Sequence, residues 1–134
     1  ANAIAQLYLK PQLLEESNDS EEDLDTELLK GKEDLSEIFS KAKSMFQEVK
    51  GEVEFSYEKA YISLRTPKKQ FAILQPSTKT RVDIGLNMKG VEPDGIIEKA
   101  GSWNSMASHR IKVTGITDLS GIQKWLQKAY ELNE

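Results

Sequence analysis

The chain has 134 residues, enough for one compact domain with a short appendage, and 38% of them are hydrophobic and 30% charged. The absence of cysteine excludes disulfides and thiolate metal sites, and no apolar run is long enough to span a membrane. The first residues lack the basic start and apolar segment of a signal peptide, so we expect a cytoplasmic protein without a membrane partner. The absence of an initiator Met favours a fragment of a longer chain.

The net charge of −4 conceals two regions of opposite sign. Residues 15–37 contain eleven acids and two bases, whereas residues 56–90 contain seven bases and two acids. We expect residues 1–14 to be the tail of an upstream helical domain. The acidic stretch of residues 15–30 reads as a linker, because its first part has too few apolar residues to offset its ordering entropy. Residues 31–134 then form one α+β domain.

The first regular element that the sequence predicts is a helix at 33–49, where apolar residues recur at three- and four-residue intervals. Acidic residues lie in its first turns and Lys50 at its end, as the helix dipole favours. Gly51 is a typical stop signal after a helix.

After Gly51 the apolar period changes to two, which predicts strands. We expect four strands, at 53–57, 60–65, 71–74 and 82–88, with turns at 58–59, 66–68 and 76–78. Strands joined by such short turns form an antiparallel meander.

Residues 89–106 form a long connection, and its length favours a functional loop. A fifth strand follows at 109–113, where apolar and polar residues alternate. Thr117 or Asp118 then caps a final helix. The apolar stripe of that helix consists of Leu119, Ile122, Trp125, Leu126, Ala129 and Tyr130. These elements predict an α+β two-layer sandwich, in which a five-stranded, mostly antiparallel sheet carries an N-terminal and a C-terminal helix on one face.

The polar face of this sheet and the loop beside it form the candidate binding surface. The candidate ligand-binding residues are Tyr61, Arg65, Arg81, Asp83, Trp103, Asn104, His109 and Arg110. Arginine binds phosphate and carboxylate through two parallel hydrogen bonds, and Tyr61 could stack on a base. The alternative is an ordinary solvated face on which Arg81 or Arg65 pairs with Asp83. Trp103 either lines a pocket or plugs the edge of the core.

His109 is the only histidine, which excludes a multi-histidine metal site, and we expect neither a metal nor a cofactor. It shares strand parity with Ile111 and Val113, which favours a hydrogen-bonded structural histidine on the apolar face. The alternative is general acid–base chemistry with Ser105 or Ser108. No nucleophile-elbow sequence accompanies these serines.

Five segments carry a family resemblance: LLKGKEDL, KAYISLR, KKQFAILQPSTKTRVDIGLNMKGVEP, GSWNSMASHR and WLQKAYE. From Leu28 to Glu131 the chain resembles an uncharacterised bacterial domain family whose members are often labelled "predicted transport protein". Similar proteins often carry a small helical domain upstream, whose last helix resembles ANAIAQLYLK, and related domains occur beside nuclease-like domains. The resemblance implies no catalytic residues.

Three functional hypotheses follow. In the first, the domain is a small ligand-binding or accessory module that binds a nucleic acid, a nucleotide or another anion through the basic sheet face. In the second, the same face is a protein-interaction or homodimerisation surface. The third, a small hydrolase or transferase that uses His109, has the least support, so the sequence does not identify an enzyme.

Overall fold

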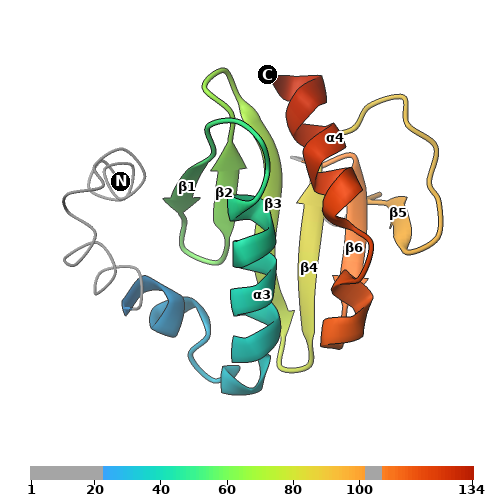
Figure 1. The fold of residues 1–134 in the computed structure, drawn as a ribbon. Coiled ribbons are helices and arrows are strands. Elements are labelled where there is room, and N and C mark those ends of the chain that lie inside the picture. Colours follow the sequence, from blue (N-terminus) through green and yellow to red (C-terminus); the bar gives the residue numbers. More distant parts are fainter. Residues whose placement is uncertain (1–22, 102–106) are drawn as a thin grey trace.

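The computed structural model describes residues 23–101 and 107–134. In this part of the chain, helices lie in front of one open sheet, as Figure 1 shows. Two of the predicted binding residues, Trp103 and Asn104, lie outside the described residues, as does the predicted tail of an upstream domain at 1–14.

The described residues contain a six-stranded antiparallel sheet with the order β1-β2-β3-β4-β6-β5. The strands are β1 (Glu54–Tyr57), β2 (Ile62–Arg65), β3 (Gln70–Thr78), β4 (Arg81–Leu86), β5 (Ile97–Lys99) and β6 (His109–Val113). The prediction of five strands was wrong, because β5 lies inside the expected long loop. It spans three residues of which only Ile97 is buried, too few to show an alternating pattern. The meander therefore holds from β1 to β4, after which the chain crosses to the outer edge and returns.

Strand β3 is longer than its pattern suggests, because the turn expected at 76–78 is part of the strand. The pairing of β3 with β2 ends at Leu74. On the β2 side of Pro76 the described residues therefore include no strand that would need a backbone N–H from this residue, so the proline is tolerated in the strand. The carbonyl of Pro76 instead accepts a hydrogen bond from Lys32 Nζ at 2.7 Å. The register with β4 shifts just after this proline, and Ser77 is the additional residue.

Helix α3 (Ser36–Gln47) follows a 3₁₀ turn, η2 (Glu33–Leu35), and helix α4 (Gln123–Asn133) lies near the end of the chain. Both helices lie on the same side of the sheet (Figure 1), and their apolar stripes form one core with the facing strand residues. Burial of these side chains is the main favourable contribution to folding. Among the described residues, no helix has the length and apolar character needed to cross a membrane.

The last helix begins later than predicted. Residues 116–119 form a 3₁₀ turn, η3 (Ile116–Leu119), and Gly121, with φ at +81°, separates it from α4. The Asp118 carboxylate accepts hydrogen bonds from the backbone N–H groups of Thr114 at 2.9 Å and Gly115 at 3.3 Å. Asp118 therefore caps the short turn and not the helix.

Part of the segment interpreted as an acidic linker is helical. Residues 23–28 form a helix, and Leu28 and Leu29 belong to the core. The Asp25 carboxylate accepts hydrogen bonds from Tyr57 Oη at 2.6 Å and from Lys43 Nζ at 2.7 Å. These contacts attach the segment to β1 and α3. The sequence conceals this because two adjacent leucines among acids show no helical period.

The first prediction concerns Gly51, which has φ at +119° and packs against Tyr130. A Cβ at this position would lie 2.5 Å from ring atoms of the buried Tyr130. We expect Gly51→Ala to lower the free energy of unfolding by about 3 kcal/mol, from backbone strain and overpacking together. Gly31→Ala is the matched control: φ is +79°, but nothing lies within 4 Å of the added Cβ, so only the backbone cost of about 1 kcal/mol applies. Equal losses in urea unfolding would contradict the contribution of Tyr130.

The second prediction concerns pH. The backbone N–H of Thr114, hydrogen-bonded to the carboxylate, holds the pKa of Asp118 below its ordinary value. A lowered pKa in the folded state adds stability above the unfolded-state pKa, and this stability is lost as the pH falls through the folded-state pKa. We expect Asp118→Ala to cost about 0.5–1 kcal/mol at pH 7, since the site is exposed, and less in acid. Asp118→Asn keeps an acceptor and should remove mainly the pH dependence. A cost independent of pH in both variants would argue against this role.

Candidate functional site

The sheet face opposite the helices has a buried acid at its centre. Asp83 lies on β4 and its side chain is 0% exposed. One carboxylate oxygen lies 3.2 Å from Arg81 Nε, and the other lies 3.2 Å from Arg110 Nη2. Ser77, the additional residue of the β3 bulge, donates a hydrogen bond to the same oxygen as Arg110. We call Arg81, Asp83, Arg110 and Ser77 the Asp83 cluster.

This cluster neutralises much of the charge that the sequence places on the sheet face. Two arginines share one buried carboxylate, and the next cation on β6, Lys112, lies 3.3 Å from the carboxylate of Glu98. Burying a carboxylate is unfavourable unless cations and hydrogen-bond donors compensate it, so the arginines are held by Asp83. The geometry corresponds to the interpretation in which Arg81 pairs with Asp83, with Arg110 added to the pair.

Tyr61 and Arg65 are not part of this cluster. Arg65 ends β2 and Tyr61 precedes that strand, whereas Asp83 lies on β4, so β3 separates them from it. Burial, and next the negative charge of Glu58, raise the pKa of Tyr61 above its ordinary value. The structure therefore does not gather the predicted binding residues into one site.

His109 lies on the helix side of β6, as its strand parity predicts, and it is 3% exposed. Its Nε2 lies 2.7 Å from the carbonyl oxygen of Val91, and its Nδ1 lies 2.7 Å from Ser108 Oγ. A carbonyl oxygen can only accept a hydrogen bond, so Nε2 carries a hydrogen and donates a hydrogen bond to the Val91 carbonyl. In the neutral ring Nδ1 then accepts from the Ser108 hydroxyl. Both ring nitrogens are engaged, and they tie the loop after β4 to β6.

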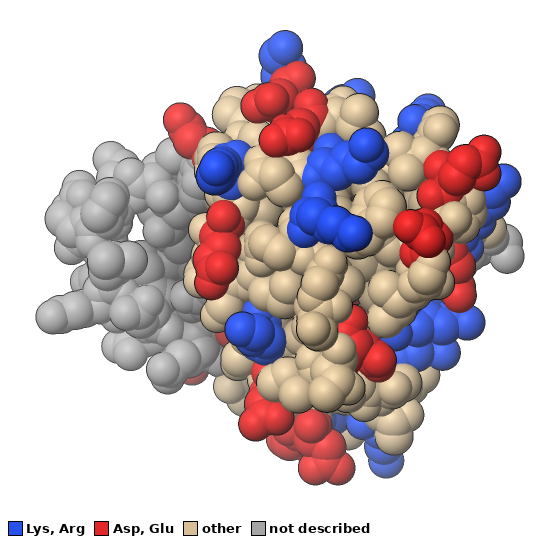
Figure 2. Space-filling view, turned by 45° about the vertical axis from the view of Figure 1, so that its right-hand side comes forward, with Lys and Arg blue, Asp and Glu red and all other residues tan. Residues whose placement is uncertain are grey.

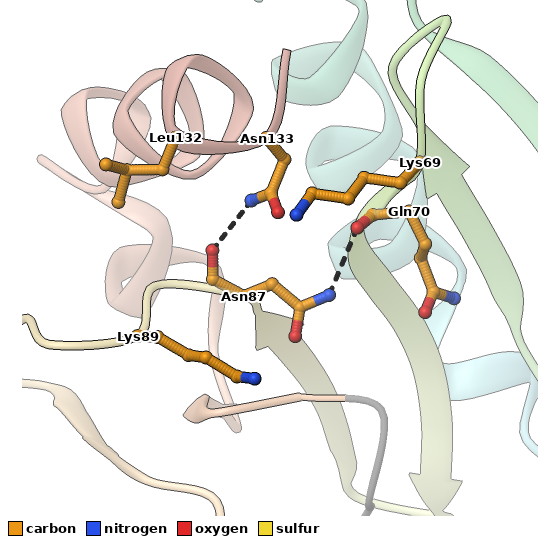
Figure 3. A pocket seen from close by; sticks show the side chains of 6 residues that line it. All are labelled: Lys69, Gln70, Asn87, Lys89, Leu132 and Asn133. Atoms are coloured by element: carbon orange, nitrogen blue, oxygen red, sulfur yellow. Dashed lines mark hydrogen bonds between the residues drawn. The ribbon is translucent and has the colours of Figure 1, made fainter.

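A pocket lies where the start of β3, the end of β4 and the C-terminus of α4 meet (Figure 3), and its volume is about 360 Å³. Its lining residues are Lys69, Gln70, Asn87, Lys89, Leu132 and Asn133. We call this the amide pocket, since three of the six side chains are amides. Antiparallel pairing places the start of β3 beside the end of β4, and α4 packs over β3.

Hydrogen bonds between the elements hold the wall of the amide pocket. The Asn133 amide donates to the backbone carbonyls of Asn87 at 2.8 Å and Ala129 at 2.7 Å. The Asn87 amide donates to the Gln70 carbonyl at 3.1 Å. Thr66 Oγ1 donates to the Asn133 carbonyl at 2.9 Å. The wall is therefore tied to α4, β3 and β4 before any ligand binds.

Two lysines give the amide pocket its positive charge. Lys69 and Lys89 are exposed, and Figure 3 shows both side chains extending along the pocket that Asn87 lines. Within residues 23–101 and 107–134 neither ammonium group forms an ion pair with a carboxylate. Two cations beside amide groups form a suitable environment for a phosphate or carboxylate group. The described residues hold no cluster of acids and histidine suited to a metal ion.

The sequence does not reveal this pocket because its residues come from three distant segments. Asn87 and Lys89 follow the last buried residues of β4, and Lys69 belongs to the turn before β3. The available signal was the basic turn TPKK and the lysine just after a strand, both of which read as ordinary turn residues. Nothing in that pattern indicates that the end of α4 completes the wall.

Comparison with known proteins identifies a family. The family model described as Domain of unknown function (DUF5655) matches residues 25–133, so the chain belongs to this family. The match includes the helix at 23–28 from Asp25 onward. No curated protein and no solved structure shows significant similarity to the chain.

The third prediction concerns the Asp83 cluster. Asp83→Ala leaves two arginines without their carboxylate, one of them with a side chain only 13% exposed. We expect a loss of about 2–4 kcal/mol in the free energy of unfolding, measured with urea. Glu98→Ala is the control, because it removes the acid from a half-exposed pair with Lys112 and should cost less than about 1 kcal/mol. Similar losses for both variants would contradict a stabilising role for the cluster.

Proposed function

We propose that this DUF5655 domain is a binding module for a small anionic ligand, and that the ligand binds in the amide pocket through Lys69 and Lys89. The observation that carries the proposal is that two lysines, which have no carboxylate partner among residues 23–101 and 107–134, line one pocket with a hydrogen-bonded wall. A preformed wall lowers the entropic cost of binding, because few side chains must be ordered. The volume of about 360 Å³ lies at the lower end of the range for small-molecule pockets.

The amide pocket suits an anion better than the basic sheet face does. A ligand on that face would compete with Asp83 for Arg81 and Arg110, and the buried carboxylate would lose its compensation. Lys69 and Lys89 are exposed, and in the described part of the chain neither forms an ion pair that a ligand would have to break. Binding there replaces only water around the ammonium groups.

The surface charge favours a small ligand over a nucleic acid. Figure 2 shows basic and acidic side chains interspersed over much of the face it displays, without a broad basic stripe. Binding to a nucleic acid backbone depends on many phosphate contacts made at once. A net charge of −4 opposes such binding further, whereas a local pair of lysines is sufficient for one anionic group.

The C-terminus of α4 disfavours an anion in the pocket, since helix C-termini carry partial negative charge. Two carbonyls at this end are already hydrogen-bonded, that of Asn133 by Thr66 and that of Ala129 by the Asn133 amide. These bonds reduce the negative potential that the ligand meets. The positive charge of Lys69 and Lys89 outweighs the remaining negative potential of the helix C-terminus.

The fourth prediction tests the pocket with inorganic phosphate. We expect Lys69→Gln and Lys89→Gln each to weaken phosphate binding about fivefold in calorimetric titrations at low salt, since each removes one charge-assisted contact at an exposed site. The matched control is Lys112→Gln, a charge loss of equal size at a lysine already paired with Glu98. It should leave binding unchanged. Absence of phosphate binding, or equal weakening by all three variants, would overturn the proposal.

A further inference from the structure

A second pocket, of about 290 Å³, shares Lys89 with the amide pocket. Its lining residues are Lys89, Gly90, Val91, Glu92, Lys99, Ser108 and His109. We call it the loop pocket, since the segment after β4 forms much of its wall. Lys89 lines both pockets, so a single ammonium group can serve a ligand in either one.

The sheet topology explains why lysines collect here. In an antiparallel sheet the starts of β3 and β6 lie at the same end as the ends of β4 and β5. Lys69 precedes β3, Lys89 follows β4 and Lys99 ends β5, so all three lie at one end of the sheet. Lys99 is opposite His109 in the ladder and exposed. Like the other two, it forms no ion pair with the described residues.

Hydrogen bonds of Ser108 and His109, which line the loop pocket, position the turn that carries Lys89. Ser108 Oγ accepts the Met88 N–H at 2.7 Å, and its proton is engaged with His109 or with the Leu86 carbonyl. His109 donates Nε2–H to Val91, whose own N–H donates to the Met88 carbonyl at 3.1 Å. The turn that carries Lys89 is thus held at both ends. Lys89 and Lys99 outnumber the single acid, Glu92, by one charge.

We infer that the ligand of this domain is an oligophosphate, with one phosphate group in the amide pocket, a linked one in the loop pocket, and Lys89 between them. This inference rests on the proposed function, since the first phosphate occupies the proposed site. Two anionic groups joined by a short link bind adjacent cationic sites far more tightly than separate ions, because the second contact is intramolecular. Lysine ammonium groups act as point charges that tolerate the varied oxygen positions of a phosphate chain.

The phosphate chain has two chemical sources, a free inorganic oligophosphate and a nucleotide. Leu132 lines the amide pocket together with three amide residues and is 51% exposed. A pocket that combines an apolar side chain with amides can contact a nucleobase, whereas an inorganic chain would make no use of the apolar side chain. The probes are therefore inorganic phosphate, inorganic tripolyphosphate and ATP, without added metal.

Calorimetric titration of the full 134-residue chain at constant ionic strength tests the inference. Tripolyphosphate should bind about tenfold or more tightly than phosphate. Lys99→Gln should weaken tripolyphosphate about fivefold and leave phosphate unchanged, whereas Lys89→Gln should weaken both. Lys112→Gln is the control for the loss of a distant charge, and neither probe should respond to it. ATP binding tighter than tripolyphosphate, and weakened by Leu132→Ala, supports a nucleotide; equal binding supports a free oligophosphate.

The outcomes separate the two proposals. Suppose that phosphate binds and that Lys69→Gln weakens this binding. If tripolyphosphate then binds no more tightly than phosphate, or if Lys99→Gln leaves its affinity unchanged, the oligophosphate inference is overturned and the proposed function stands. If neither phosphate nor tripolyphosphate binds the unmodified chain, both are overturned. Thermal unfolding of each variant without ligand shows whether it is folded, and the three lysines are exposed, so the substitutions should leave the midpoint unchanged.

Discussion

The packing of Phe71 between the two helices is the contact on which the rest of the fold depends. Its ring meets Phe46 of α3 at 6.0 Å and Tyr130 of α4 at 5.2 Å between centroids, both edge to face. Such aromatic pairs add to the burial of their apolar area. Tyr130 Oη also donates to the Glu52 carbonyl at 2.9 Å, which ties α4 to the segment that enters β1. One cluster thus joins both helices, the central strand and the first connection.

The same contact sets the dimensions of the amide pocket. Phe71 occupies a bulge, where the register between β2 and β3 shifts, and Gln70 and Lys69 come just before it. Asn133 comes three residues after Tyr130 and reaches the Asn87 carbonyl. The lining residues at the start of β3 and on α4 therefore lie within three positions of Phe71 or of Tyr130, so the contact between these two rings fixes how far apart they are. A pocket built this way keeps its spacing without a ligand, which is the condition for low-cost binding.

The parts of the fold that could be predicted are those with a long, regular period. Helix α3 and strand β4 each repeat their apolar pattern over two or more cycles, and the structure has both where expected. Strand β5 and the helix at 23–28 bury one or two side chains each, so tertiary contacts define them and local pattern does not. The prediction of a turn at Pro76 was wrong for a related reason. Whether a proline interrupts a strand depends on whether a neighbouring strand needs its N–H, and the local sequence does not show the neighbouring strand.

The candidate site was harder to predict, because the effect of a charge depends on its partners. Residues 56–90 carry an excess of five positive charges, and among these side chains arginine is the type best suited to bind an anion through paired hydrogen bonds. The buried Asp83 makes the arginines less suited to a ligand than the lysines, because a buried carboxylate must be compensated by cations. The sheet register places Arg81 of the same strand and Arg110 of the neighbouring strand beside it.

The lysines that remain for the proposed ligand lie at strand ends and form no ion pair with the described residues. Lys69, Lys89 and Lys99 lie at three separate strand ends, so no stretch of sequence shows them together. The strand order β3-β4-β6-β5 brings these strand ends to the same end of the sheet. His109, the only histidine of the sequence, holds the loop that carries Lys89 in place through the hydrogen bond from its Nε2–H to the Val91 carbonyl. In the proposed site, the position of a lysine therefore depends on a structural histidine.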